Sequence, residues 1–207
     1  MKKLLFIIIL MPFIGIAQIT DNLFLEFNTV FVDDLEYTNK DINLFSPDMS
    51  SGYNNKSDIE QGVSMSFGYN FSDKLSFGVS YIKADVSASN DIEYFVGNFT
   101  DKSVFANYDL CNIQKIVCFV HASMGEVEYN ASRFLVYDDS ELPINSPNGK
   151  ANKKALGLGL QVNLKNHTAI VAKYIINEIE DDGFDGWDYG SGVDRFAIIS
   201  IGLKLNL

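Results

Sequence analysis

The sequence predicts an all-β fold, namely an eight-stranded antiparallel up-and-down β-barrel that crosses a membrane. Three observations lead to it: segments in which large apolar and small residues alternate, the absence of charge from the large apolar positions, and connections that are alternately short and long. The composition agrees, because aromatic residues, Ser, Asn and Gly are abundant and no segment has a convincing 3.6-residue apolar period. After the N-terminus no apolar stretch approaches the length of about 18 residues that a membrane-spanning helix needs.

The N-terminus has the layout of a secretory signal peptide. Lys2 and Lys3 precede the apolar run Leu4–Ile14, and the small-x-small site Gly15–Ala17 follows it. The run is too short for a membrane span, which needs roughly 20 residues. We therefore expect residues 1–17 to be a cleaved signal peptide and residues 18–207 to form one barrel domain.

The clearest strand pattern lies on both sides of the turn Ser72–Lys74. From Gln61 to Phe71 the odd positions are mostly large and apolar, whereas the even positions are Gly, Ser and Asn. After the turn the alternation restarts and continues to Tyr81. Two alternating runs around a short turn predict a β-hairpin.

Six further segments repeat this pattern, which brings the expected number of strands to eight. About 9–11 residues suffice for a tilted strand to cross a bilayer, and the segments approach that length. They are residues 23–31, 104–110, 116–124, 156–164, 170–176 and 197–207.

The two faces of these strands predict which side meets lipid. The large apolar face carries no Asp, Glu, Lys or Arg, as hydrocarbon requires, and the small-residue face suits the narrow interior of an eight-stranded barrel. Replacing outward Leu160 or Ile201 by Arg is therefore expected to be costly, and replacing inward Gly159 by Ser to be mild. Aromatic side chains near the strand ends fit interfacial girdles: Tyr69, Phe71, Tyr81, Tyr108 and Tyr174.

The connections alternate in length, as in outer-membrane barrels with short periplasmic turns and long extracellular loops. Short turns are expected at Ser72–Lys74, Asn112–Lys115 and Lys165–His167. Long loops are expected at Asp33–Asp58, Ala84–Lys102, Glu126–Lys154 and Glu178–Asp194.

On these patterns residues 19–207 resemble the OmpA/OmpX-like outer-membrane β-barrel domains. The resemblance rests on Ser64–Phe71, on Ala155–Val162 and on the alternating C-terminal strand. Barrels of this type usually end in an aromatic residue, and Leu207 departs from that. The resemblance implies a small barrel in the bacterial outer membrane, and it specifies no activity.

Four charged residues are expected on the inward face: Glu26, Glu60, Lys173 and Lys204. Since an unpaired buried charge is very costly, we expect them to neutralise one another near the closure between the first and last strands. An ion or proton path is the alternative, but eight strands leave no open channel, which favours a structural network.

The histidines and acidic loops offer no established site. An enzyme acting on lipid would need His121 and Ser123 near the outer rim, and neither a G-x-S-x-G nor an H-E-x-x-H motif is present, so we expect no catalysis and no cofactor. His167 falls in a turn. The loop Glu178–Asp194 carries seven carboxylates but lacks EF-hand spacing, so no metal site is assigned.

Cys111 and Cys118 flank the second short turn in an oxidising compartment. By parity Cys111 points inward and Cys118 outward, which opposes a simple cross-strand bridge, although a β-bulge would realign them. The sequence leaves a disulfide open.

The functional prediction is an outer-membrane protein with a structural or surface-interaction role through acidic extracellular loops, and neither a catalyst nor a general porin. Expected partners are outer-membrane lipid and, through the loops, lipopolysaccharide or a surface ligand. Loss of Lys2 and Lys3 takes the formal charge from −11 to −13, which argues against nucleic acid. The alternative is a secreted lipocalin-like binder, which would have its apolar face inward.

Overall fold

A computed structural model describes residues 22–33, 60–89, 93–137, 140–146, 148–164, 167–180 and 194–207. The expected signal peptide and most of the first and last long loops, at 34–59 and 181–193, lie outside the described residues. Within the described ranges no helix has the length and apolarity to cross a membrane.

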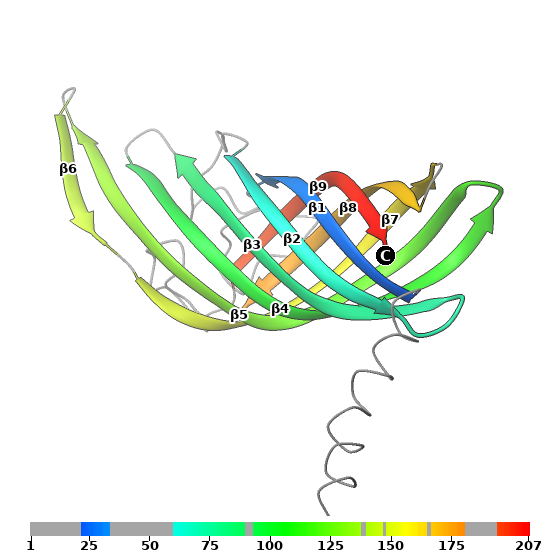
Figure 1. Cartoon of the computed structure of the whole chain (residues 1–207). Coiled ribbons are helices and arrows are strands. Elements are labelled where there is room, and N and C mark those ends of the chain that lie inside the picture. Colours follow the sequence, from blue (N-terminus) through cyan, green and yellow to red (C-terminus); the bar gives the residue numbers. More distant parts are fainter. Residues whose placement is uncertain are drawn as a thin grey trace, which may run out of the picture.

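The described strands form one antiparallel sheet that closes on itself (Figure 1). Its closure is made by β1, which pairs with both β2 and β9, while the remaining neighbours pair in chain order, with β4 paired to β5 and β5 to β7. Eight strands make the barrel, as predicted, and β6 is an addition that pairs with β5. The strands are β1 (Leu23–Asp33), β2 (Glu60–Asn70), β3 (Leu75–Ser89), β4 (Glu93–Ile113), β5 (Ile116–Tyr137), β6 (Ser140–Asn145), β7 (Asn148–Asn163), β8 (Thr168–Ile179) and β9 (Asp194–Asn206).

Two of the expected long loops are mostly strand, which corrects the sequence prediction. Residues 84–102 continue β3 and β4 with a gap of only 90–92, and residues 126–154 are largely β5, β6 and β7. The hairpin of β4 and β5 is thereby lengthened into an arm, with β6 at its far end (Figure 1). The alternation of apolar residues stops where the lipid-facing band ends, but the backbone hydrogen bonding between the strands continues. Strand ends predicted from lipid-facing residues are therefore too early.

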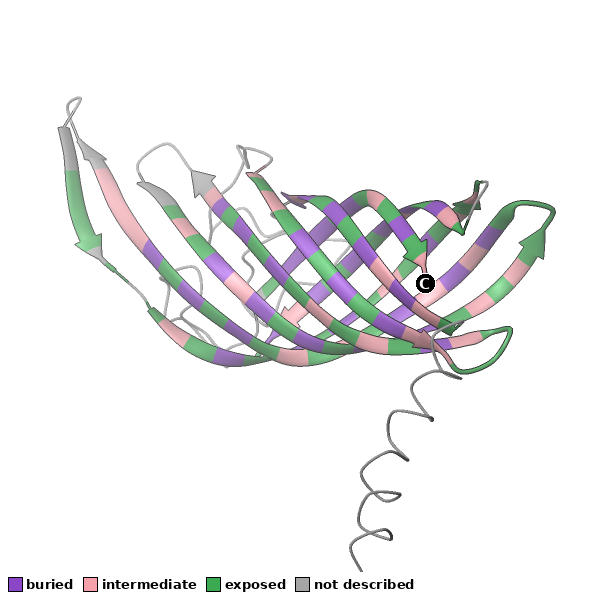
Figure 2. Cartoon of the chain, in the orientation of Figure 1, coloured by how far each residue is buried: buried purple, intermediate pink, exposed green. Residues whose placement is uncertain are grey.

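The predicted faces of the barrel are confirmed by burial, which alternates along the strands (Figure 2). Outward Leu160 is 51% exposed, and its neighbours Leu156 and Leu158 are exposed as well. Inward Ala155 and Ile175 are buried. Large apolar side chains thus cover the outside of the barrel, an arrangement that only a hydrocarbon solvent stabilises.

The interior has two zones. The half next to the short turns holds polar side chains, among them Glu26, Asn107 and Lys173. The half at the opposite end also buries Asp101, Lys153 and Asn177, but most of it is an apolar cluster: Val30, Val32, Ile82, Ala84, Val86, Phe99, Val127, Tyr129, Ala131, Ala151, Ala155, Ile175, Ile179, Phe196 and Ile198. The predicted interior of small side chains is therefore found only in part, because both halves also bury large rings, such as Phe24 in one and Phe196 in the other.

Phenylalanine rings fill the space above several inward glycines. Phe24 lies opposite Gly68 in the register of β1 and β2, and Phe119 lies opposite Gly159 in that of β5 and β7. A Cβ atom at either glycine would overlap the ring. The expectation that Gly159→Ser would be mild is therefore wrong, because the lumen is packed at this position by an aromatic ring from the neighbouring strand.

Candidate functional site

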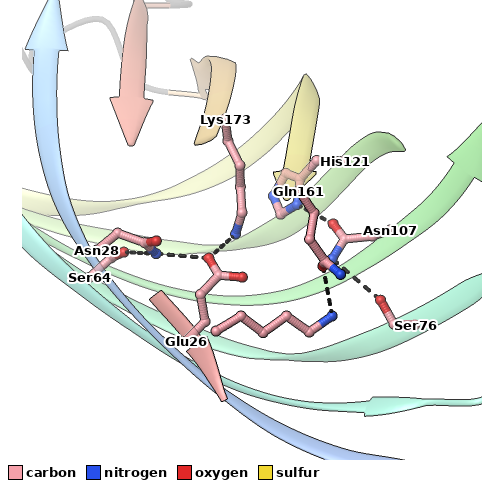
Figure 3. A network of polar contacts seen from close by, with 9 residues as sticks. Glu26, Asn28, Ser64, Ser76, Asn107, His121, Gln161 and Lys173 are labelled. Carbon is pink, nitrogen blue, oxygen red and sulfur yellow. Dashed lines mark hydrogen bonds and ion pairs between the residues drawn. The ribbon is translucent and has the colours of Figure 1, made fainter. Parts of the chain in front are cut away.

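Glu26 is the centre of a buried polar network in the lumen (Figure 3). It lies on β1, is 2% exposed, and its carboxylate forms an ion pair with the ammonium of Lys173 on β8. Asn28 Nδ2 donates to Glu26 Oε1 at 2.8 Å and to Ser64 Oγ at 2.9 Å. The structure thus brings two of the four predicted charges into direct contact and adds neutral groups that satisfy the carboxylate.

Lys204 lies beside Glu26 in the β1–β9 register, but its ammonium has other contacts. Its Nζ atom donates to Gln161 Oε1 at 3.2 Å and lies 4.1 Å from the centroid of the Phe24 ring. Glu60, at the upper end of β2, accepts a 2.6 Å hydrogen bond from Ser87 Oγ and is separate from the other three charges. The predicted set of four is therefore one ion pair, one adjacent lysine and one distant glutamate.

A second buried ion pair joins Asp101 on β4 to Lys153 on β7. Both side chains are almost completely buried, and the Ser103 hydroxyl donates to the same carboxylate. Sequence reasoning missed this pair because both residues fall in segments predicted as loops. The alternation of the two strands contained a signal. Asp101 lies two residues before the inward Ser103, and Lys153 lies two residues before the inward Ala155, so both are expected on the inward face.

His121 is embedded in the lumen. It is 4% exposed, its Nδ1 atom lies 2.7 Å from Asn107 Oδ1, and its ring stacks on Phe105 with centroids 5.7 Å apart (Figure 3). Ser123 lines a small internal cavity of about 20 Å³ nearby. This environment contains an amide in place of the carboxylate that would orient a catalytic base, and it is remote from the outer rim.

The mouth of the barrel at the end of the short turns is a polar vestibule of about 570 Å³. Amide and hydroxyl residues make up half of its lining, and the ionisable groups are those of Asp73, Lys74, Asp109, His167 and Lys204. Among the residues that the structure describes, no group of three or more His, Cys, Asp or Glu side chains is arranged to hold a metal ion.

A row of charged residues encircles part of the outer surface just above the apolar band, and its sign alternates from strand to strand. Its ion pairs join Lys102 to Glu128 at 3.9 Å, Lys150 to Glu126 and Glu128 at 3.4 and 3.3 Å, Lys154 to Glu180, and Arg195 to Glu178 at 2.9 Å. We call these residues the charged rim. Since charge is costly in hydrocarbon, the rim marks the level at which the lipid headgroups begin. The hydrogen bond from Lys154 lowers the pKa of Glu180, so this pair persists as the medium becomes mildly acidic.

The two cysteines are direct partners in the register of β4 and β5. An irregularity between Asp109 and Cys111 shifts the register by one residue. Because one extra residue reverses the parity of the strand beyond it, Cys111 turns to the outer face on which Cys118 lies. The prediction that Cys111 points inward is therefore wrong. Both thiols are free in the structure.

Comparisons with known proteins identify the fold. No family model matches the sequence, and a search of curated proteins finds no match. Among solved structures, Neisserial surface protein A matches with a TM-score of 0.54 and 13% identity, over 89% of this chain and 97% of that protein. Two others are OprG from Pseudomonas aeruginosa (TM-score 0.47, 9% identity, 90% and 95% covered) and Ail from Yersinia pestis (TM-score 0.44, 11% identity, 89% and 97% covered).

The chain has the fold of an eight-stranded outer-membrane β-barrel. This is the fold of the OmpA/OmpX-like barrels that the sequence resembles. Together with the apolar outer band and the charged rim, it places this barrel in the bacterial outer membrane. The alternative of a lipocalin-like binder is wrong for this barrel, because such a binder has its large apolar face around an internal ligand, whereas Leu156, Leu158 and Leu160 face outward.

Proposed function

We propose that this barrel is a non-conducting anchor that presents the β4–β5 arm and the acidic loops to the cell exterior, with a structural or surface-interaction role and no catalytic or porin activity. The apolar cluster in the extracellular half of the lumen is the observation that supports it most. A barrel that passes ions needs a continuous polar path. In this half of the lumen the buried ion pair of Asp101 and Lys153 lies beside Ile82, Val127 and Ile179 of the apolar cluster, which interrupt such a path.

Two aromatic rings of this apolar cluster come from strands that are far apart in the sheet. Phe99 on β4 and Phe196 on β9 are each 1% exposed, and their ring centroids are 5.2 Å apart. These two strands lie on opposite sides of the barrel in the strand order, so the rings meet across the lumen. Side chains in contact across the lumen leave no continuous passage for solvated ions.

The arm supports the surface role. On β4 the continuous outward apolar series ends at Val104, beyond which Val96 is an isolated exposed apolar residue, and the strand begins at Glu93. The remaining residues extend roughly 35 Å along the strand at about 3.3 Å per residue, beyond the lipid-facing band. The neighbouring loop Glu178–Asp194 contributes seven carboxylates, of which those in 181–193 lie outside the described residues.

Conductance in planar lipid bilayers tests the non-conducting role. We expect the wild-type protein to give no stable current steps above the lipid baseline. Replacing Phe99 and Phe196 by Ser removes the rings that meet across the lumen, and we expect intermittent openings from this variant if it retains its heat-modifiable gel migration. Stable open channels from the wild type would contradict the proposal.

Binding of purified lipopolysaccharide in the presence of Mg²⁺ tests the surface role. Carboxylates bind phosphate-bearing surfaces through divalent cations, so the acidic loop is the segment expected to respond. We expect the substitution of Asn for Asp181, Asp182, Asp185 and Asp188 to weaken the Mg²⁺-dependent part of binding several-fold. Equal binding by wild type and variant, with and without Mg²⁺, would exclude this loop as the interacting surface.

A further inference from the structure

β4 and β5 are the longest of the described strands, and their hairpin carries the arm. At the end of the hairpin next to the short turn, only three residue pairs lie between the register shift and the turn. Ile113 pairs with Ile116, and Gln114 and Lys115 make the turn between them, with Gln114 at a φ of 57°. Above this turn the ladder is interrupted by the register shift between Asp109 and Cys111. The bulge therefore sets the register of the last three residue pairs before the turn.

We propose that Cys111 and Cys118 form an intramolecular disulfide that fixes this bulged register. The two residues are directly opposed across the strands and lie on the same face of the hairpin. Directly opposed residues of antiparallel strands have Cα atoms about 4.5–5.5 Å apart. That spacing lies within the range of about 4.4–6.8 Å found for disulfides, so the bond needs no movement of the backbone.

Both cysteines lie on the outer face, and the neighbouring register supports this. Cys118 pairs on its other side with Leu160 of β7, which is exposed to lipid. Val117, one residue before Cys118, is buried in the lumen opposite Asn112. Without the bulge, Cys111 would instead lie opposite Val117, on the other face from Cys118. The disulfide therefore selects one of two registers that differ by a single residue.

The bond forms by thiol–disulfide exchange with a periplasmic protein disulfide, which is the oxidant. The thiolate of one cysteine attacks that disulfide and forms a mixed disulfide, releasing one thiol of the oxidant. The second cysteine thiolate then attacks the mixed disulfide, forms the Cys111–Cys118 bond and releases the other thiol. Two electrons and the two cysteine protons pass in total to the oxidant, which becomes a dithiol.

Differential thiol labelling of the protein in isolated outer membranes tests the bond. The membranes are quenched in acid, denatured in detergent, labelled with one maleimide, reduced, and labelled with a heavier maleimide before intact-mass measurement. We expect the wild-type chain to carry none of the first label and two of the second. Two copies of the first label, or a disulfide-linked dimer, would overturn the proposal.

A matched variant with two cysteines tests the register. In Val117→Cys with Cys118→Ser, the new thiol lies on the inner face, away from Cys111. We expect it to take the first label at both cysteines, so that almost all cross-linking is lost. Cross-linking as complete as in the wild type would mean that the unbulged register is populated, and would overturn the assignment of the bond to this register.

The consequence for stability has its own readout. Reductant is expected to lower the temperature at which the wild type loses its heat-modifiable folded band. The double variant Cys111→Ser with Cys118→Ser is expected to lose the band at the temperature of the reduced wild type, with or without reductant. An unchanged temperature for the reduced wild type would mean that the bond does not hold the hairpin.

Discussion

At the scale of single residues, the barrel interior is governed by the cost of burying charge. Lys173 is 7% exposed and Glu26 is 2% exposed, so neither ion has water to replace its partner. Removing one member of a buried ion pair costs far more than the pair itself contributes, because the other charge remains without compensation. Each buried charge of the network therefore needs its partner if the lumen is to stay dry, whatever the network contributes to stability in total.

The first prediction concerns this pair. Glu26→Gln is expected to lower the free energy of unfolding by about 3–5 kcal/mol, because it leaves the ammonium of Lys173 buried and unpaired. Adding Lys173→Met should recover part of the loss. Unfolding titrations in detergent or lipid vesicles would measure the coupling through a double-mutant cycle.

A second double-mutant cycle, between Glu26 and Lys204, is the control for the cycle between Glu26 and Lys173. It is next to Glu26 in register but donates to Gln161, so Glu26→Gln and Lys204→Met are expected to be closer to additive. A larger coupling with Lys204 than with Lys173 would show that the pairing in solution differs from that of the structure. The exposed pair Lys150 and Glu126 should change stability by less than about 1 kcal/mol when either is neutralised.

At the scale of strands and hairpins, backbone pairing continues beyond the point at which the outward apolar residues end. The outward faces of β4, β5 and β7 change from apolar to charged at Lys102, Glu126 and Lys154, yet backbone pairing runs on. Cross-strand ion pairs on this rim replace apolar contacts with lipid. The arm is thus part of the same sheet as the barrel while it lies outside the lipid-facing band.

The second prediction separates the arm from the barrel. Replacing residues 138–147 by a short Gly-Ser linker removes β6, which pairs with β5 above the point where β7 begins. Since no paired residue of the barrel is lost, we expect the folded gel band and the unfolding midpoint to remain unchanged. Val127→Ser, a control in the buried apolar cluster on the same β5, should lower the midpoint. Loss of the folded band in the deletion variant would mean that β6 belongs to the barrel itself.

At the scale of the whole molecule, the barrel has an apolar exterior band and a packed core. The outer band meets hydrocarbon, and the half of the lumen next to the arm is lined mostly by apolar side chains of seven strands. The polar half of the lumen opens to the periplasmic vestibule. The lumen therefore becomes more apolar from the short turns toward the arm.

The third prediction tests the position of the membrane. Leu160→Arg, in the middle of the outward series of β7, should cost about 2–4 kcal/mol in refolding titrations into lipid vesicles. Asn152→Arg, on the same face of β7 but level with the charged rim, should cost at most about 1 kcal/mol. Equal costs would mean that the apolar band is misplaced along the strand.

The sequence by itself determined the barrel, its strand number, its inner and outer faces and its short turns. These features follow from the period-2 alternation, because a strand between lipid and a narrow lumen exposes every second residue to hydrocarbon. The same parity places Glu26, Lys173 and Lys204 on the inward face, and all three are buried in the lumen. Parity needs only the local sequence, and it holds wherever the strand is regular.

Only the tertiary structure decided how far the strands extend, which charges meet and where parity fails. The alternation does not predict the arm, because the outward residues of the arm meet water instead of lipid. Glu26 meets Lys173 instead of its register neighbour Lys204 because Gln161 and the Phe24 ring hold the Lys204 ammonium. The bulge before Cys111 reversed the parity of one strand end, and such an irregularity arises from the pairing of two strands, which neither strand specifies alone.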